Sequence, residues 1–252
     1  MTQQERQTLI LDKIKQTGFV TIDELVDHFK VTPQTVRRDL NQLAKAKKIT
    51  RHHGGAGIES STSNTDYQTR KIMDLQEKEK IASELVKMIP DGSSIFINIG
   101  TTNETIAQAL LNHKGLQIVT NNLNVASILG AKEDFSVVIA GGEVRHRDGG
   151  VIGEATEEFI KNFRMDFGII GISGIDLDGS LLDFDYREVR VAQAIIANSR
   201  QVLLAAAHSK FGRNAMVRLG NISQADHFFT DATPPAEIQQ ILLDQRVTLH
   251  IT

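Results

Sequence analysis

The hydrophobic positions of the first fifty residues recur at helical spacing and predict three short helices. The first covers residues 3–17, ends before Gly18 and has an apolar side made of Leu9, Ile10 and Ile14. The sequence Thr-Ile-Asp-Glu at residues 21–24 is a capping box, which starts a second helix with apolar positions at Leu25, Val26 and Phe29. A short link leads to the third helix, as in a helix-turn-helix.

The third predicted helix begins at Pro33, with Thr32 as its cap, and buries Val36, Leu40 and Leu43. Another face carries side chains that can hydrogen-bond to base edges, namely Gln34, Arg37, Arg38 and Asn41. Arg pairs with guanine and Asn or Gln with adenine, so this face suits the major groove of DNA. Taken alone, the helix could equally be a solvated surface helix.

The segment after this helix predicts a small hairpin. Residues 49–51 suit a strand, Gly54-Gly55 supplies a turn with positive φ, and residues 56–58 can return. A hairpin beside a helix-turn-helix is a wing that would lie against the DNA backbone or minor groove. His52 and His53 are open to two other interpretations, an exposed polar pair or a metal site. The residues expected to contact DNA are Thr32, Gln34, Thr35, Arg37, Arg38, Asn41, Arg51, His52 and His53.

A polar, hydroxyl-rich stretch separates this head from a different pattern. We expect a DNA-binding domain at 1–58, a linker at 59–73 and a second domain at 74–252. In the second domain short apolar strands alternate with helices. The pattern predicts a parallel sheet with helices on both faces, and hence an α/β protein. The strands are expected at 94–98, 116–120, 136–140, 166–171, 202–206, 228–230 and 247–251, and the helices at 74–88, 103–111, 125–129, 154–163, 187–197 and 236–243.

Composition and charge narrow the possible functions. The 252 residues include no Cys, which excludes disulfides and thiolate metal sites. No apolar run is long enough to span a membrane and the first residues do not resemble a signal peptide, so a cytoplasmic protein is expected. The net charge of −3 is unevenly divided. Residues 1–57 hold 10 Lys and Arg against 6 Asp and Glu, and the remainder holds 18 against 25, which concentrates attraction for phosphate at one end.

The carboxyl ends of the predicted strands carry residues that suit a phosphorylated ligand, because ligands of such sheets bind at that edge. Gly100 precedes a helix whose first amides and hydroxyls could hold an anion, and Lys210 could bring a cation. Ordinary turns, caps and a surface lysine are the alternative for each piece. The expected effector-binding residues are Gly100, Thr101, Thr102, Thr120, Asn121, Asn122, Gly141, Gly142 and Lys210.

Several of these motifs together resemble those of the DeoR family of bacterial repressors. In the head they are Thr35-Val36-Arg37-Arg38-Asp39-Leu40 and Arg51-His52-His53-Gly54-Gly55-Ala56. In the second half they are Gly100-Thr101-Thr102, Val119-Thr120-Asn121, Gly141-Gly142 and Ser209-Lys210-Phe211-Gly212. The resemblance implies a winged helix-turn-helix joined to a sensor domain akin to ribose-5-phosphate isomerase, a tetramer, and release from double-stranded operator DNA when a sugar phosphate binds.

A closer similarity over residues 99–102, 119–126, 147–155 and 167–176 to one repressor of that family implies sn-glycerol 3-phosphate as the inducer and control of glycerol metabolism genes. Asn98 and Ala207 stand where the family pattern has Asp, which removes two carboxylates from the expected pocket and bears on which sugar phosphate is bound.

An enzyme is the alternative interpretation of the second domain. Its candidate acids and bases are Asp176, Asp178, Asp185 and Glu188, with Lys210 to stabilise an enediolate. However, Asp178-Gly179 is also a good turn, and Asp185 and Glu188 suit the start of a helix. The attached DNA-binding head favours sensing over isomerase chemistry, with no cofactor, no metal and no membrane partner expected.

Overall fold

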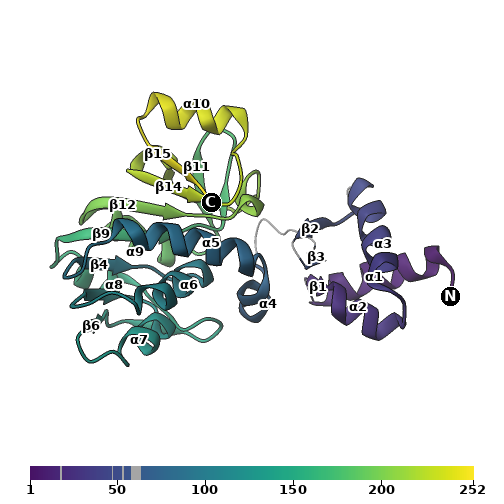
Figure 1. Ribbon diagram of the computed structural model, residues 1–252, viewed down its shortest axis with the longest axis horizontal. Coiled ribbons are helices and arrows are strands. Elements are labelled where there is room, and N and C mark those ends of the chain that lie inside the picture. Colours follow the sequence, from purple (N-terminus) through teal and green to yellow (C-terminus); the bar gives the residue numbers. More distant parts are fainter. Residues whose placement is uncertain (18, 47, 53, 58–63) are drawn as a thin grey trace. The chain divides into compact units, whose positions relative to one another are not determined.

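The computed structural model describes residues 1–17, 19–46, 48–52, 54–57 and 64–252. Contacts within the chain divide it into two compact units, Met1–Leu75 and Gln76–Thr252 (Figure 1). Each unit has its own buried core, and each is described by itself.

The N-terminal unit is a three-helix head with a small antiparallel sheet. Its helices are α1 (Gln3–Thr17), α2 (Ile22–Phe29) and α3 (Pro33–Lys45), followed by the short α4 (Tyr67–Ile72). The strands β1 (Phe19–Thr21), β2 (Thr50–His52) and β3 (Gly55–Gly57) form a sheet in the order β1-β3-β2. The predicted winged helix-turn-helix is therefore present. The strand before α2 joins the wing, and α4 lies within the predicted linker.

Local sequence signals explain where these helices begin. The capping box of α2 is complete, because Glu24 N donates to Thr21 Oγ1 at 3.1 Å and Thr21 N donates to Glu24 Oε2 at 2.8 Å. Thr32 Oγ1 likewise accepts from Thr35 N at 3.3 Å, and Pro33 occupies the first position of α3. Of the two turn glycines, only Gly54 has positive φ (82°).

The core of the head confirms most predicted apolar positions and corrects one. Ile10, Ile14 and the α3 residues Val36 and Leu40 have no exposed surface. Leu9 is 47% exposed, so its predicted burial is wrong. Arg6, one turn before Ile10, faces α3 instead. The partner of Arg6 is described below.

The C-terminal unit is built on a seven-stranded, fully parallel sheet with the order β15-β14-β12-β9-β4-β5-β6. These strands are β4 (Ser94–Ile97), β5 (Gln117–Thr120), β6 (Ser136–Ile139), β9 (Met165–Gly171), β12 (Ser199–Ala205), β14 (His227–Thr230) and β15 (Thr248–Ile251). The chain builds outward from β4 on one side, then returns to β9 on the other. The switch point between β4 and β9 is where ligands bind in sheets of this kind.

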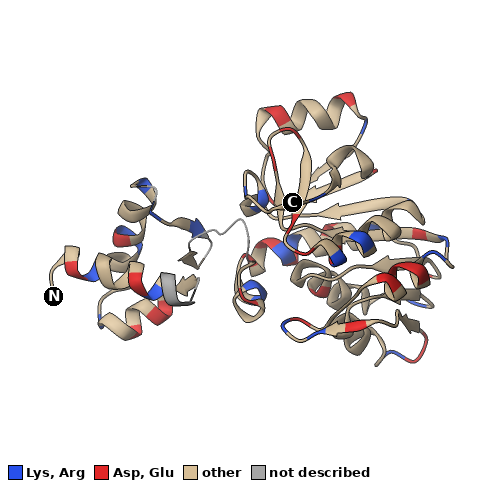
Figure 2. Ribbon diagram, turned by 180° about the vertical axis from the view of Figure 1, so that it is seen from behind, with Lys and Arg blue, Asp and Glu red and all other residues tan. Residues whose placement is uncertain are grey.

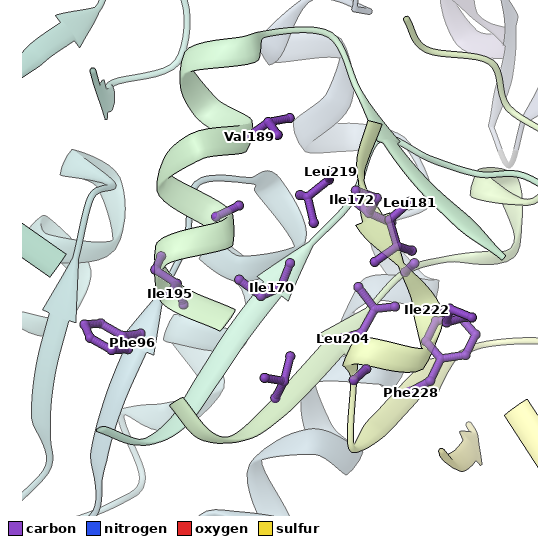
Figure 3. Close-up of a cluster of buried hydrophobic side chains, with 14 of the residues drawn as sticks. Phe96, Ile170, Ile172, Leu181, Val189, Ile195, Leu204, Leu219, Ile222 and Phe228 are labelled. Atoms are coloured by element: carbon purple, nitrogen blue, oxygen red, sulfur yellow. The ribbon is translucent and has the colours of Figure 1, made fainter. Parts of the chain in front are cut away.

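Helices cover both faces of the sheet. They are α5 (Leu75–Leu85), α6 (Thr101–Leu110), α7 (Leu123–Leu129), α8 (Glu154–Ile160), α9 (Tyr186–Ala197) and α10 (Ala236–Asp244), with the short 3-10 helices η1 (Val86–Met88), η2 (His208–Lys210) and η3 (Ile222–Gln224). One core cluster joins the sheet to α5, α6 and α7. The other joins it to α8, α9 and α10. Figure 3 shows part of this cluster, with Val189 and Ile195 of α9 on the side of Ile170 of β9. Neighbouring strand residues such as Ile95 and Phe96 belong to different clusters, as expected for strands buried on both faces.

Two small additions were not predicted. The strands β10 (Gly174–Ile175), β11 (Ser180–Asp183) and β13 (Val217–Asn221) form an antiparallel sheet, and its Leu181 and Leu219 pack into the second core cluster. A hairpin of β7 (Glu143–Arg145) and β8 (Gly150–Ile152) follows β6. The fold class is as predicted, an α/β domain joined to a winged helix-turn-helix.

Candidate nucleic-acid interface and effector site

The residues predicted to contact bases share one surface of α3. Thr32, Gln34, Arg37, Arg38 and Asn41 are exposed and Thr35 is half-buried. Together with Gln42 and Lys45 they line a shallow surface hollow of about 650 Å³. The opposite side of α3 is held in the core by Val36 and Leu40. The helix therefore presents a polar, basic face to solvent. Figure 2 marks the Lys and Arg positions of the chain in blue.

A buried ion pair fixes the rotation of α3 against α1. Asp39 has no exposed surface and accepts from Arg6 Nε at 2.5 Å and from Gln3 Nε2 at 2.7 Å. Because Asp39 neighbours Arg38, this contact sets which side of α3 faces outward. The burial of Asp39 was not predicted, since a charge beside two arginines on a helix looks like solvated surface.

The wing carries a further cationic side chain, Arg51, that interacts electrostatically with Arg37 of α3. Arg51 lies on β2 and is half-buried, and burial together with the charge of Arg37 lowers the pKa of its guanidinium. Its buried Nη1 has no hydrogen-bond partner among the described residues. Two like charges that influence each other in this way favour an anion between or beside them. His52 lies in β2, and His53 is outside the described residues.

All predicted effector-binding residues lie at one edge of the large sheet. The parallel strands put their carboxyl ends together, so the segments after β4, β5, β6 and β12 lie on the same side. Those segments carry, in that order, Gly100–Thr102, Thr120–Asn122, Gly141-Gly142 and Lys210 in η2. The segment after β9, which begins at Ile172, lies between the β4 and β12 segments and was missed.

The start of α6 has the features of an anion site. Gly100 caps the helix with φ 137°, a conformation that side-chain-bearing residues rarely adopt, and contributes no side-chain cap. Glu104 N bonds back to Gly100 O at 3.0 Å, so the helix is formed from its first turn. The amides at the beginning of a helix have no acceptor within it and carry the positive end of the helix dipole. A phosphate bound there would face Thr101 and Thr102.

Three buried carboxamides lie at the carboxyl ends of β4 and β5 and in the first turn of α6. Asn98, Asn103 and Asn121 are at most 2% exposed, and the Oδ1 atom of each has no hydrogen-bond partner among the described residues. Asn103 Nδ2 donates to the carbonyls of Asn98 and Ile99 at 2.9 and 3.1 Å, which leaves its oxygen facing Gly171 at the end of β9. Asn103 was not predicted. Its signal was an Asn inside a helix, a position where it is unfavourable unless its side chain bonds to nearby backbone.

Some of the predicted effector-binding residues have structural roles within the chain. Thr120 Oγ1 donates to Ile97 O at 2.6 Å and accepts from Asn122 N at 3.1 Å. Asn122 caps α7 through bonds from Asn124 N and Val125 N. A Cβ on Gly142 would lie 2.1 Å from Thr156 Oγ1, whereas one on Gly141 would meet nothing within 4 Å. Gly142 thus allows α8 to pack closely.

The carboxylates considered for catalysis occupy structural positions. Asp185 caps α9, and Asp178 accepts from Ser180 N at 2.8 Å in the turn formed with Gly179. Arg145 lies among acidic groups and donates to Glu188 at 2.6 Å and to both oxygens of Asp148 at 2.8 Å. Burial and the charge of Asp183 raise the pKa of Glu188 to about 7, against the opposing effect of Arg145. Asp176 Oδ1 accepts from Leu177 N at 3.0 Å. These contacts give each candidate carboxylate a role in the fold.

Comparison with known proteins identifies the family. A model of the DeoR-like helix-turn-helix domain matches residues 6–62, and one of the DeoR C terminal sensor domain matches residues 73–232. The chain belongs to the DeoR family of transcriptional regulators.

Full-length relatives agree. The chain is 57% identical over 251 residues to the glycerol-3-phosphate regulon repressor of Escherichia coli strain K12, covering 100% of both. It is 53% identical to the glycerol-3-phosphate regulon repressor of Haemophilus influenzae, covering 99% of this chain and 97% of that one. Like these relatives, the chain is a DNA-binding transcriptional repressor rather than an enzyme.

Among solved structures, ribose 5-phosphate isomerase A from Neisseria gonorrhoeae is similar over 53% of this chain and 52% of its own, with 16% identity and a TM-score of 0.39. Within the described ranges, no helix is both long and apolar enough to cross a membrane. The same residues include no group of three or more His, Asp or Glu placed to hold a metal ion.

Proposed function

We propose that this chain represses genes of a glycerol-3-phosphate regulon by binding operator DNA through α3 and the wing. The observation that carries the DNA contact is the basic face of α3 with Arg51 beside it. Burial and the charge of Arg37 lower the pKa of this guanidinium, and its Nη1 has no hydrogen-bond partner among the described residues. The regulon is taken from the names of the 57% and 53% identical relatives. Paired heads of an oligomer, a tetramer by family resemblance, would contact symmetric half-sites.

Operator binding by single variants of the full chain tests this interface. Arg37→Ala or Arg38→Ala should cost about 1–3 kcal/mol on the specific site and relax its specificity if that side chain reads a base. If it contacts only phosphate, binding should weaken for every sequence and the salt dependence should fall. Lys80→Ala removes the same charge from an exposed position of α5 and serves as the control. Unchanged operator affinity in both arginine variants would contradict the assignment.

The same proposal includes release of the operator when a phosphorylated metabolite, sn-glycerol 3-phosphate, binds at the carboxyl edge of the sheet. The start of α6 would hold the phosphate. The Oδ1 atoms of Asn98 and Asn121, which have no partner within the described ranges, would accept from the hydroxyl groups of the metabolite. Binding must favour the arrangement of heads that fits DNA poorly, and by reciprocity operator DNA must weaken effector binding. A different sugar phosphate is the alternative effector.

Calorimetry and operator release, measured on the full chain with sn-glycerol 3-phosphate, fructose phosphates and deoxyribose phosphate, test this second part. Thr102→Val and Lys210→Ala should leave operator affinity intact and weaken effector binding. Loss of one hydrogen bond to a charged group, about 1.5–3 kcal/mol, corresponds to roughly a 10–100-fold higher effector requirement. Lys114→Ala, at an exposed position before β5, is the matched control. An unchanged response in both variants would remove these residues from the site.

A further inference from the structure

Two histidines face each other at the other end of the sheet from β6. His227 is the first residue of β14, and His250 lies on the neighbouring edge strand β15 (Figure 1). In the parallel register His250 is opposite Phe229, two residues after His227, so all three side chains lie on the same face. His227 Nδ1 and His250 Nε2 are 3.2 Å apart.

The two rings are held in place and remain accessible. His250 stacks on Phe229 with ring centroids 4.3 Å apart and an interplanar angle of 7°. Both histidines are half-buried rather than covered. Burial lowers the pKa of His227, and burial together with the charge of His227 lowers the pKa of His250.

We propose that His227 and His250 together bind a divalent transition-metal cation such as Zn²⁺ through the facing ring nitrogens, with water in the remaining positions. Two nitrogens that each lie about 2.0–2.1 Å from one tetrahedral zinc ion are about 3.3 Å apart, which matches the observed spacing. The separation also lies within the range of about 2.7–3.2 Å for an N–H donor bond. The spacing is therefore compatible with a bound cation as well as with a shared proton.

Nearby charges favour a cation. The carboxylate of Glu84 in α5 acts electrostatically on His250, and Asp226 acts on His227, each opposing the fall in pKa of its histidine. Glu84 forms an ion pair with Lys87 at 2.6 Å. Its carboxylate therefore attracts the cation electrostatically and does not coordinate it. Imidazole ligands suit Zn²⁺, Ni²⁺ and Cu²⁺, and hard oxygen-seeking ions such as Mg²⁺ should not compete. The ion would fasten edge strand β15 to β14.

Calorimetric titration of the untagged, chelator-treated full chain with ZnCl₂ and NiCl₂ tests the proposal. Wild type should bind one ion per chain at this site, with binding lost as the pH falls and both rings protonate. His227→Gln and His250→Phe should each weaken binding at least about tenfold, and the phenylalanine keeps a ring stacked on Phe229. His146→Gln, at an exposed position of the β7–β8 hairpin, is the matched control and should bind as wild type does.

Two further measurements keep the result unambiguous. Substituting both His52 and His53 by Gln should leave the site intact, and if that variant alone loses the metal, the ion belongs to the wing and the proposal fails. Copper(II) paramagnetic resonance on wild type should show coupling to two imidazole nitrogens whatever the stability of the variants. Absence of that coupling, or binding equal in wild type and in the His227→Gln/His250→Phe double variant, would show that the pair is only a hydrogen bond.

Discussion

Removing the carboxylate of the buried Arg6–Asp39 pair should destabilise α3 far more than expected for the surface residue that Asp39 resembles in the sequence. Asp39 accepts two bonds, and the side chain of Arg6 is only 7% exposed. Asp39→Ala leaves that guanidinium buried without its counter-charge, which costs about 3–5 kcal/mol. A unit of this size, Met1–Leu75, is stable by roughly 4–11 kcal/mol, so the head would lose about a quarter or more of its free energy of unfolding.

Hydrogen exchange of the full chain measures this loss at the helix itself. The amides of α3 should exchange about 10²–10⁴-fold faster in Asp39→Ala, and operator affinity should fall with them. The double variant Arg6→Met/Asp39→Leu removes both charges and should be close to wild type in exchange or slower. Lys87→Ala breaks the exposed pair with Glu84 and should cost less than about 1 kcal/mol.

The stabilising role of the Arg6–Asp39 pair is refuted if the α3 amides of Asp39→Ala exchange at the wild-type rate. It is also refuted if the double variant loses as much protection from exchange as the single variant. The first result would mean that solvent compensates Arg6, and the second that the two apolar side chains do not fill the site. Operator affinity of the double variant separates folding from function. If α3 is oriented by this pair, affinity falls even where exchange is restored.

Three further outcomes are expected. Gly142→Ala should destabilise the C-terminal unit by about 1–3 kcal/mol because its Cβ would meet Thr156, whereas Gly141→Ala should be nearly neutral, and equal urea midpoints would contradict this. The pKa of Glu188, raised to about 7, means that the folded chain holds this proton more tightly than the unfolded chain, so its stabilising effect is complete below its ordinary pKa of 4.5 and is lost as the pH rises through 7. Glu188→Gln should flatten stability over that range, and a slope like that of wild type would count against it. Thr21→Ala should cost the head about 1 kcal/mol by hydrogen exchange of α2, and no change would show the capping box to be dispensable.

Much of the fold could be predicted because its signals are local. A capping box joins residues three apart, and an apolar stripe repeats every three or four residues, so α2 and α3 follow from neighbouring side chains. Buried strands of the large sheet are short apolar runs bounded by turns, which made the α/β class evident. The small antiparallel sheet of β10, β11 and β13 escaped because its strands are only two to five residues long, and β11 pairs with β13 across more than thirty residues.

The candidate effector site was likewise predictable only in its local features. The sequence by itself determined which residues follow each strand, and it therefore placed Gly100 and Lys210 at the carboxyl edge once the strands were known to be parallel. It could not determine which hydroxyls were already occupied, as Thr120 is by the carbonyl of Ile97. Nor could it show that the Asn103 oxygen finds no hydrogen-bond partner in the part of the chain that the structure describes. Those outcomes depend on the order and register of the strands.

Tertiary structure alone decided the environments of the charged and titratable groups. Asp39 looks like surface in the sequence, yet the packing of α1 on α3 buries it against Arg6. Arg51 influences Arg37 only because the wing folds back beside the helix, and His227 meets His250 only because β14 and β15 run parallel in one register. Helices and caps form from interactions within a few residues. A charge acquires its partner, and so its chemistry, only when distant segments are packed together.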